Sequence, residues 1–241
     1  MLKIGHRGAA GYEPENTLRS FRKAIELGAD MVECDLRLSK DRQIVIIHDR
    51  LVNRTTNGHG LVFRKTLSQL KNLDAGLGEK IPTLAEVLAL VKGRCLINVE
   101  IKSRGIVRYL IKELKSLDFP LADLYISCNN LATLVYIKKI IPEVKMAWLF
   151  RATDTYLKET SWIFCMFIFF PFVKNFVIGK LKKNSIEAVN IHHLLATKRF
   201  IDRIHECNKM VCAWTVDADR KIRWLKEWQI DGIFTNYLDR L

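Results

Sequence analysis

The chain has 241 residues, of which 49% are hydrophobic, and its 39 Lys and Arg against 26 Asp and Glu give a formal net charge of +13. This length and composition suit one large α/β domain or two small ones and argue against a disordered chain. The positive charge favours an anionic partner (nucleic acid, an acidic membrane surface or a phosphorylated substrate), with a merely basic, soluble surface as the alternative.

Short apolar, β-branched runs alternate with amphipathic, Lys- and Glu-rich segments along the whole chain. The predicted strands are 2–5, 31–38, 95–101, 124–127, 144–149, 188–191, 210–216 and 232–235. The predicted helices are 15–27, 84–91, 105–117, 131–140, 197–207 and 217–227. Because most of these eight strands are followed by a helix, we predict a parallel sheet, and at this length a (β/α)8 TIM barrel that forms a single domain over residues 1–241. An open doubly wound sheet is the alternative.

One long excursion interrupts this rhythm after the second strand, at about residues 43–82. The run QIVIIHD predicts a strand that returns antiparallel to the second strand, followed by the loop RTTNGHG and a short helix over 66–73. Long excursions from a regular barrel are often functional. We therefore expect this insertion to contribute to the site.

Two histidines follow apolar runs near the start of the chain. His6 stands with Arg7 at the end of the first strand, in IGHRG, and His48 ends QIVIIHD. A histidine in such a place is more often structural than catalytic. Both, however, are predicted at the carboxyl side of the sheet, which is the face where barrel enzymes work. Two histidines beside a bound phosphate can act as general acid and general base.

Carboxylates recur at alternate positions on two predicted strands. Glu33 and Asp35 share one face of MVECDLRL, and Glu100 and Lys102 share one face of LINVEIKS. Three carboxylates that converge from two strands suit a hard divalent ion, Ca²⁺ or Mg²⁺. The alternative for each pair alone is a salt bridge or a solvated edge. The charges of Arg7 and Lys102 suit non-bridging phosphate oxygens.

The order HRG…PENT, E-x-D, HD, E-x-K, WT and GIFTN resembles the glycerophosphodiester phosphodiesterase family, a group of (β/α)8 barrels. The resemblance covers nearly the whole chain, and the combination is specific although each motif alone is weak. It implies that His6 and His48 form the acid–base pair. It also implies that Glu33, Asp35 and Glu100 bind the divalent metal.

The same resemblance implies roles for four further residues. Arg7 and Lys102 would contact the phosphate, and Trp214 in CAWTV would pack beside the glycerol. Glu15 of PENT would orient its neighbours rather than react. The chain departs from the pattern at its last strand, which ends TNYLD where relatives often show TDxP.

The implied reaction is hydrolysis of a glycerophosphodiester to glycerol phosphate and an alcohol. A lysophospholipase D that acts on lysophospholipids at a membrane surface is the second hypothesis. A non-catalytic phosphate- or membrane-binding barrel is a third, and it would lack a histidine or a metal carboxylate, whereas all of them are present. No nucleic-acid partner is expected, because the aromatic residues gather in one apolar block instead of interleaving with basic residues.

That apolar block is WIFCMFIFFPFV, Trp162–Val173, within an apolar segment of about 161–179. It has no polar face, so something other than water is expected to cover it. It falls short of the roughly 20 apolar residues of a spanning helix. Flanking lysines and arginines favour peripheral membrane contact, with a span, a homodimer interface or burial against the barrel as alternatives. The chain also shows no secretory signal and no C-x-x-C pair, which predicts a cytoplasmic protein, with association with a membrane surface as a further possibility.

Overall fold

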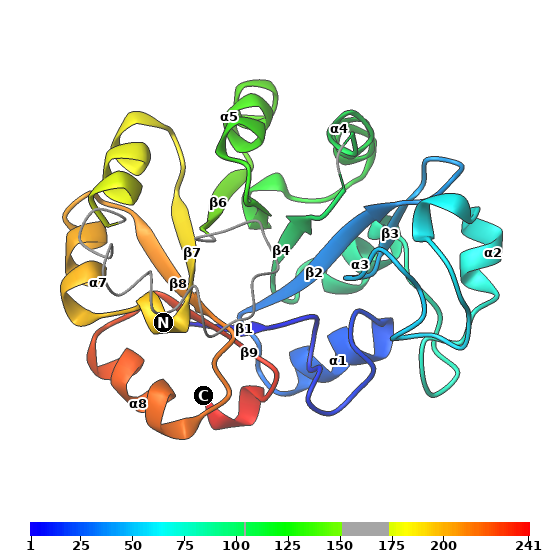
Figure 1. Ribbon diagram of the computed structural model, residues 1–241, viewed down its shortest axis with the longest axis horizontal. Coiled ribbons are helices and arrows are strands. Elements are labelled where there is room, and N and C mark those ends of the chain that lie inside the picture. Colours follow the sequence, from blue (N-terminus) through cyan, green and yellow to red (C-terminus); the bar gives the residue numbers. More distant parts are fainter. Residues whose placement is uncertain (104, 151–173) are drawn as a thin grey trace.

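The computed structural model describes residues 1–103, 105–150 and 174–241. Eight parallel strands form a closed barrel, because the sheet order β1-β9-β8-β7-β6-β5-β4-β2 is completed by pairing of β1 with β2 (Figure 1). The strands are β1 (Leu2–Gly5), β2 (Met31–Leu38), β4 (Leu96–Ile101), β5 (Leu124–Cys128), β6 (Lys145–Phe150), β7 (Ala188–His192), β8 (Met210–Trp214) and β9 (Gly232–Thr235). The predicted TIM barrel is confirmed, and the open sheet is excluded. That the chain is a single domain stays a prediction.

Helices surround the barrel in the order expected for a (β/α)8 fold (Figure 1). They are α1 (Leu18–Glu26), α3 (Leu84–Val91), α4 (Val107–Ser116), α5 (Leu131–Ile140), α7 (Lys198–His205) and α8 (Asp219–Glu227), and residues 174–183 are also helical. Short 3₁₀ turns are η1 (Val62–Arg64), η2 (Leu121–Asp123), η3 (His193–Leu195) and η4 (Leu238–Arg240). The first helix begins later than the predicted residue 15 because Thr17 is its N-cap and accepts a hydrogen bond from the backbone N–H of Ser20.

The excursion after β2 forms its own packed layer on one side of the barrel (Figure 1). As predicted, its strand β3 (Ile44–Ile46) pairs antiparallel with β2, and Ile46 lies opposite Leu36. The short helix α2 (Leu67–Lys71) begins at the N-cap Thr66 and is slightly shorter than predicted. Val45, Ile47, Val52, Val62, Leu70, Ala75 and Ile81 form a small separate core under this layer. The antiparallel return brings the end of β3 back toward the middle of β2.

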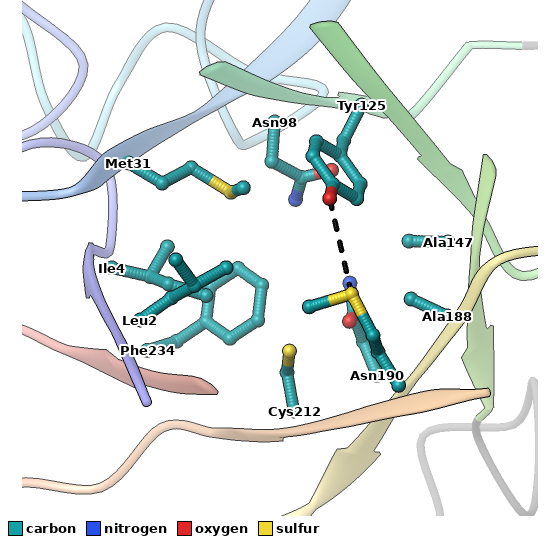
Figure 2. Close-up of a pocket in the computed structure, with 11 residues that line it drawn as sticks. Leu2, Ile4, Met31, Asn98, Tyr125, Ala147, Ala188, Asn190, Cys212 and Phe234 are labelled. Atoms are coloured by element: carbon teal, nitrogen blue, oxygen red, sulfur yellow. Dashed lines mark hydrogen bonds between the residues drawn. The ribbon is translucent and has the colours of Figure 1, made fainter. Parts of the chain in front are cut away.

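Alternation along the barrel strands separates two environments. On β2, Val32, Cys34 and Leu36 pack into the helix layer, whereas Met31 belongs to the cluster inside the barrel. The interior encloses a cavity lined by Leu2, Ile4, Met31, Asn98, Tyr125, Ala147, Ala188, Asn190, Met210, Cys212 and Phe234 (Figure 2). The Tyr125 hydroxyl donates to Met210 Sδ across this space at 3.9 Å. The barrel is thus filled mainly by apolar side chains toward the amino ends of its strands.

Gly8 marks a close approach between the loop after β1 and helix α1. Its φ is +86°, and an added Cβ would lie 2.7 Å from the carbonyl carbon of Ser20. We expect Gly8→Ala to lower the free energy of unfolding by about 1–3 kcal/mol, measured by urea unfolding, because both the backbone and the contact are strained. Gly28→Ala is the control: its φ is +76° with no atom within 4 Å of the added Cβ, so it reports the backbone cost alone. Equal losses in the two variants would contradict the close contact.

The apolar block Trp162–Val173 lies outside the described residues. Its membrane contact, burial or role in a homodimer therefore stay predictions. Among the helices in residues 1–103, 105–150 and 174–241, none combines the length and the apolar character that a membrane span requires.

Candidate active site

Three carboxylates meet at the carboxyl end of the barrel strands. Glu33 and Asp35 extend from β2 and Glu100 from β4, and the register places Asp35 directly opposite Glu100. One ligand oxygen of each lies within 4.8 Å of the others. Glu33 and Asp35 are only 2% and 1% exposed. The alternation and the register of two neighbouring strands are enough to bring this cluster together.

Two basic side chains offset part of this buried negative charge. The backbone N–H of Arg7 donates to Glu33 Oε2 at 2.9 Å, and its guanidinium Nε lies 3.4 Å from Asp35 Oδ2. Lys102 Nζ lies 2.5 Å from Glu100 Oε1 and 3.3 Å from Asp35 Oδ1. Arg7 and Lys102 therefore stand beside the carboxylates, where they can also attract the anionic part of a ligand.

The pKa values of the two β2 carboxyls diverge. Burial, followed by the charges of Asp35 and Glu100, raises the pKa of Glu33 well above its usual value. Burial opposes ionisation of Asp35 as well, but Lys102, His48 and Arg7 hold its pKa well below the usual range. Three carboxylates thus face two cationic side chains, and Asp35 Oδ1 accepts no hydrogen bond among the described residues, although Lys102 Nζ lies 3.3 Å away. A hard divalent cation with oxygen ligands fits this donor set.

The raised pKa of Glu33 predicts how metal affinity depends on pH. A cation must replace the proton of this carboxyl, so affinity should increase as pH rises through the raised pKa. We expect the increase in Tm caused by Mg²⁺ or Ca²⁺ to be larger at pH 8 than at pH 6. Thermal unfolding at both pH values measures it, and Glu33→Gln should remove most of the pH dependence. A metal-induced shift that shrinks as pH rises would contradict this site.

His6 follows β1 and lies against the loop after β9. Its Nδ1 is 2.9 Å from Asn236 Oδ1, while Asn236 Nδ2 donates to Asp217 Oδ2 at 2.7 Å. Because the Asp217 carboxylate only accepts, the Asn236 oxygen faces the ring, so Nδ1 of His6 carries the hydrogen and Nε2 keeps the lone pair. Burial and the charge of Arg7 lower the pKa of His6 to about 4, against the opposing charges of Asp35 and Glu100. His6 is therefore neutral at neutral pH.

His48 reaches the same end of the barrel by the antiparallel return of β3. The backbone N–H of Ile47 donates to the carbonyl of Asp35 at 2.9 Å, and the Arg37 guanidinium donates to the carbonyl of His48. His48 Nδ1 donates to Asp49 Oδ1 at 2.7 Å. Burial lowers the pKa of His48, and the negative charge of Asp35 opposes that shift.

Glu15 and Trp214 occupy different parts of the rim. Glu15 accepts from Arg7 Nη1 at 2.9 Å, so it contacts one of the basic side chains beside the carboxylate cluster. Trp214 ends β8, which is separated from β2 by β9 and β1. Its ring packs edge-on against His192, with centroids 5.1 Å apart. The structure thus gathers the predicted basic, acidic and imidazole groups around β1, β2 and β4, and places Trp214 on another part of the rim.

The roles of several residues at the site were not predicted from the sequence, although Asn16 lies in PENT and Asn236 in GIFTN. Asn16 donates to Asp35 Oδ2 at 2.8 Å and accepts from the Asp35 backbone at 3.2 Å. Its φ of +59° is the type of conformation that Asn tolerates better than most residues. Asn236 and Asp217 orient His6 from the far end of the chain. The HD dipeptide could have suggested Asp49 as the partner of His48. Arg54, whose guanidinium donates to Asp49 and Glu15, is not marked by anything in the loop sequence.

Comparison with known proteins identifies the family of the chain. The model described as the Glycerophosphoryl diester phosphodiesterase family matches residues 6–240. A glycerophosphodiester phosphodiesterase of Caldanaerobacter subterraneus subsp. tengcongensis is 34% identical over 252 residues, covering 98% of this chain and 93% of its own. One of Bacillus altitudinis is 32% identical over 259 residues, covering 100% of this chain and 96% of its own.

Solved structures give the same result. A phosphodiesterase of Oleispira antarctica, determined in complex with the product sn-glycerol-3-phosphate, has a TM-score of 0.79 and 28% identity, covering 98% of this chain and 93% of its own. The glycerophosphodiester phosphodiesterase of Thermotoga maritima has a TM-score of 0.79 and 26% identity, covering 99% and 96%. The chain is therefore an enzyme that belongs to the glycerophosphoryl diester phosphodiesterase family.

Proposed function

We propose that this enzyme hydrolyses glycerophosphodiesters to glycerol phosphate and an alcohol, with a divalent metal ion held by Glu33, Asp35 and Glu100 and with His6 and His48 as the acid–base pair. One P–O ester bond breaks, and the oxygen that replaces it on phosphorus comes from water. The main support is the grouping of three carboxylates, with ligand oxygens within 4.8 Å of one another, beside two basic side chains and two imidazoles.

The surrounding residues suit a phosphate diester. When bound, Ca²⁺ or Mg²⁺ would neutralise phosphate charge and make a nearby hydroxyl more acidic. Arg7 and Lys102 would bind non-bridging oxygens, and Trp214 would pack against the glycerol. A neutral His6 can accept a proton, and both imidazoles have an Nδ1 partner that leaves Nε2 as the nitrogen with the lone pair. The related phosphodiesterase that was determined with sn-glycerol-3-phosphate supports the choice of a small glycerol phosphate product.

The test is release of choline from glycerophosphocholine, measured with EDTA and after addition of Ca²⁺ or Mg²⁺. We expect release that EDTA abolishes and that one of the metals restores. Release that persists after complete metal removal would overturn the metal-dependent reaction. If folded, metal-loaded protein releases no alcohol from any diester tried, the hypothesis of a non-catalytic phosphate-binding barrel would be favoured.

A lysophospholipid is the second candidate substrate. The observation that favours it is the apolar sequence Trp162–Val173, flanked by basic residues, which suits contact with an anionic membrane. Lysophosphatidylcholine is therefore assayed beside glycerophosphocholine, with and without anionic vesicles. Faster cleavage of the lysolipid, lost in Phe167→Asp/Phe170→Asp, would support lysophospholipase D activity. Lysophospholipase D activity would be ruled out if the soluble diester is cleaved faster and the double variant leaves both rates unchanged.

A further inference from the structure

Arg54, in the loop of the excursion after β2, binds two carboxylates at once. Its Nε donates to Asp49 Oδ2 at 2.7 Å and its Nη2 to Asp49 Oδ1 at 3.2 Å. On the other edge, Nη1 donates to Glu15 Oε2 at 2.7 Å and Nη2 to Glu15 Oε1 at 2.8 Å. Of these four hydrogen bonds, the two to Glu15 join the excursion to the loop that follows β1, and the two to Asp49 hold the excursion itself together.

Each of these carboxylates also binds a residue of the candidate active site. Asp49 Oδ1 accepts from His48 Nδ1 at 2.7 Å. Glu15 Oε1 accepts from Arg7 Nη1 at 2.9 Å, and Arg7 Nε lies 3.4 Å from Asp35 Oδ2. A continuous chain of hydrogen-bonded and ionic contacts thus runs from one imidazole through Arg54 to the guanidinium beside the carboxylates.

The geometry distinguishes Arg54 from an ordinary surface cation. Its side chain is 47% exposed, and an isolated ion pair with that exposure contributes little. Here, however, both edges of a planar fork are used, which an ammonium group cannot reproduce. The hydrogen bonds to Glu15 and Asp49 also raise the pKa of Arg54, and those from Arg54 lower the pKa of Asp49. Arg54 thus favours the ionised form of Asp49, which accepts from His48 Nδ1–H.

We propose that Arg54 is a positioning residue that fixes the His48 imidazole and the Arg7 guanidinium relative to each other by holding Asp49 and Glu15 together. The proposal rests on the proposed function, because it takes His48 as an acid–base group and Arg7 as a phosphate ligand. Arg54 itself is expected to touch neither the substrate nor the metal. The excursion would thus help to assemble the site through this one side chain.

The test compares Arg54→Ala and Arg54→Lys with Arg19→Ala. Arg19 is the matched control because its side chain is 48% exposed and is paired with Glu13, for which no contact with the carboxylates or histidines of the site is described. Choline release from glycerophosphocholine is measured in metal-loaded enzyme over a range of substrate concentrations. We expect kcat/KM to fall by about 10–100-fold in Arg54→Ala, in line with losses of outer residues that orient reacting groups. Both kcat and KM should change, since His48 and Arg7 are affected together, and Arg54→Lys should remain impaired.

Addition of ethylguanidine separates positioning from a general loss of structure. At tens of millimolar it should restore part of the activity of Arg54→Ala, whereas the same concentration of NaCl should not, and Arg19→Ala should need no restoration. A kcat/KM of Arg54→Ala within twofold of wild type would overturn the proposal, as would full activity of Arg54→Lys or a loss that ethylguanidine does not reverse. Failure of the proposed function itself is recognised separately, by wild-type enzyme that lacks metal-dependent release or by His48→Ala with wild-type activity.

Discussion

Replacement of His6 by alanine is expected to lower kcat for a glycerophosphodiester by about 10²–10⁴-fold, the usual contribution of general acid–base catalysis. The physical reason is the state of the ring: burial and Arg7 lower its pKa to about 4, and Asn236 accepts from Nδ1–H. A neutral imidazole with its Nε2 lone pair available is therefore held beside the carboxylate cluster. Steady-state kinetics of choline release measure the effect, and His48→Ala should show a loss of similar size.

His59→Ala is the control for this prediction, because His59 lies in the excursion loop with Asn53 as its polar neighbour and is not part of the proposed acid–base pair. Its activity should stay close to that of wild type. Circular dichroism and thermal unfolding establish that each variant is folded. If folded, metal-loaded His6→Ala keeps kcat within about tenfold of wild type, His6 is not an acid–base group.

The low pKa of His6 also predicts a stability effect with a definite sign. Between its ordinary value of 6.5 and about 4, the unfolded chain binds a proton at this histidine and the metal-free folded protein does not. The stability that His6 contributes is therefore present above pH 6.5 and is lost as pH falls toward 4. The free energy of unfolding of His6→Ala, measured in urea, should accordingly decrease less over this pH range than that of wild type.

Replacement of Asp35 by asparagine is expected to impair stability, metal binding and activity together. Asp35 is a candidate metal ligand and the shared partner of Arg7, Lys102 and Asn16. A neutral amide cannot balance two cations in a buried site, so we expect a loss of about 3 kcal/mol in the free energy of unfolding of the metal-free protein. The increase in Tm produced by Ca²⁺ or Mg²⁺ should disappear, and kcat/KM should fall by at least about 100-fold.

Asp118→Asn provides the matched control, since the Asp118 side chain is 100% exposed and is paired only with Lys92 among its described ionic contacts. Urea unfolding, metal titration followed by Tm, and choline release are measured on both variants. Asp35→Asn protein that still gains the wild-type Tm increase with metal would show that the cation binds elsewhere.

The barrel could be predicted from the sequence because its strands are short apolar runs separated by amphipathic helices. The bounds of β1, β2 and β9 agree with the predicted ones, and the others differ by one or two residues. The antiparallel return of β3 was also predicted from QIVIIHD. The expected helix start at residue 15 was wrong because Glu15 and Asn16 turn toward the site and Thr17 caps the helix. A capping side chain can displace a helix end that periodicity alone would extend.

The carboxylate cluster could also be predicted from the sequence. Side chains alternate along a strand, so Glu33 and Asp35 must share a face, and one neighbouring strand in register suffices to add Glu100. The placement of His6 and Arg7 follows from their position at the end of the first strand. These parts of the site depend on local periodicity and on the common direction of the strands.

The amino-acid sequence by itself determined the parallel barrel, the face on which the carboxylates meet and the family to which the chain belongs. Only the tertiary structure decided which groups orient the side chains of the site. These are Asn236 for His6, Asn16 for Asp35, and Arg54 for His48 and Arg7 together. These contacts join loops that are up to 230 residues apart in the chain. Loop conformation has no repeating pattern, and a hydrogen bond depends on distances of a few tenths of an ångström, so such partners exist only once barrel closure brings the loops together.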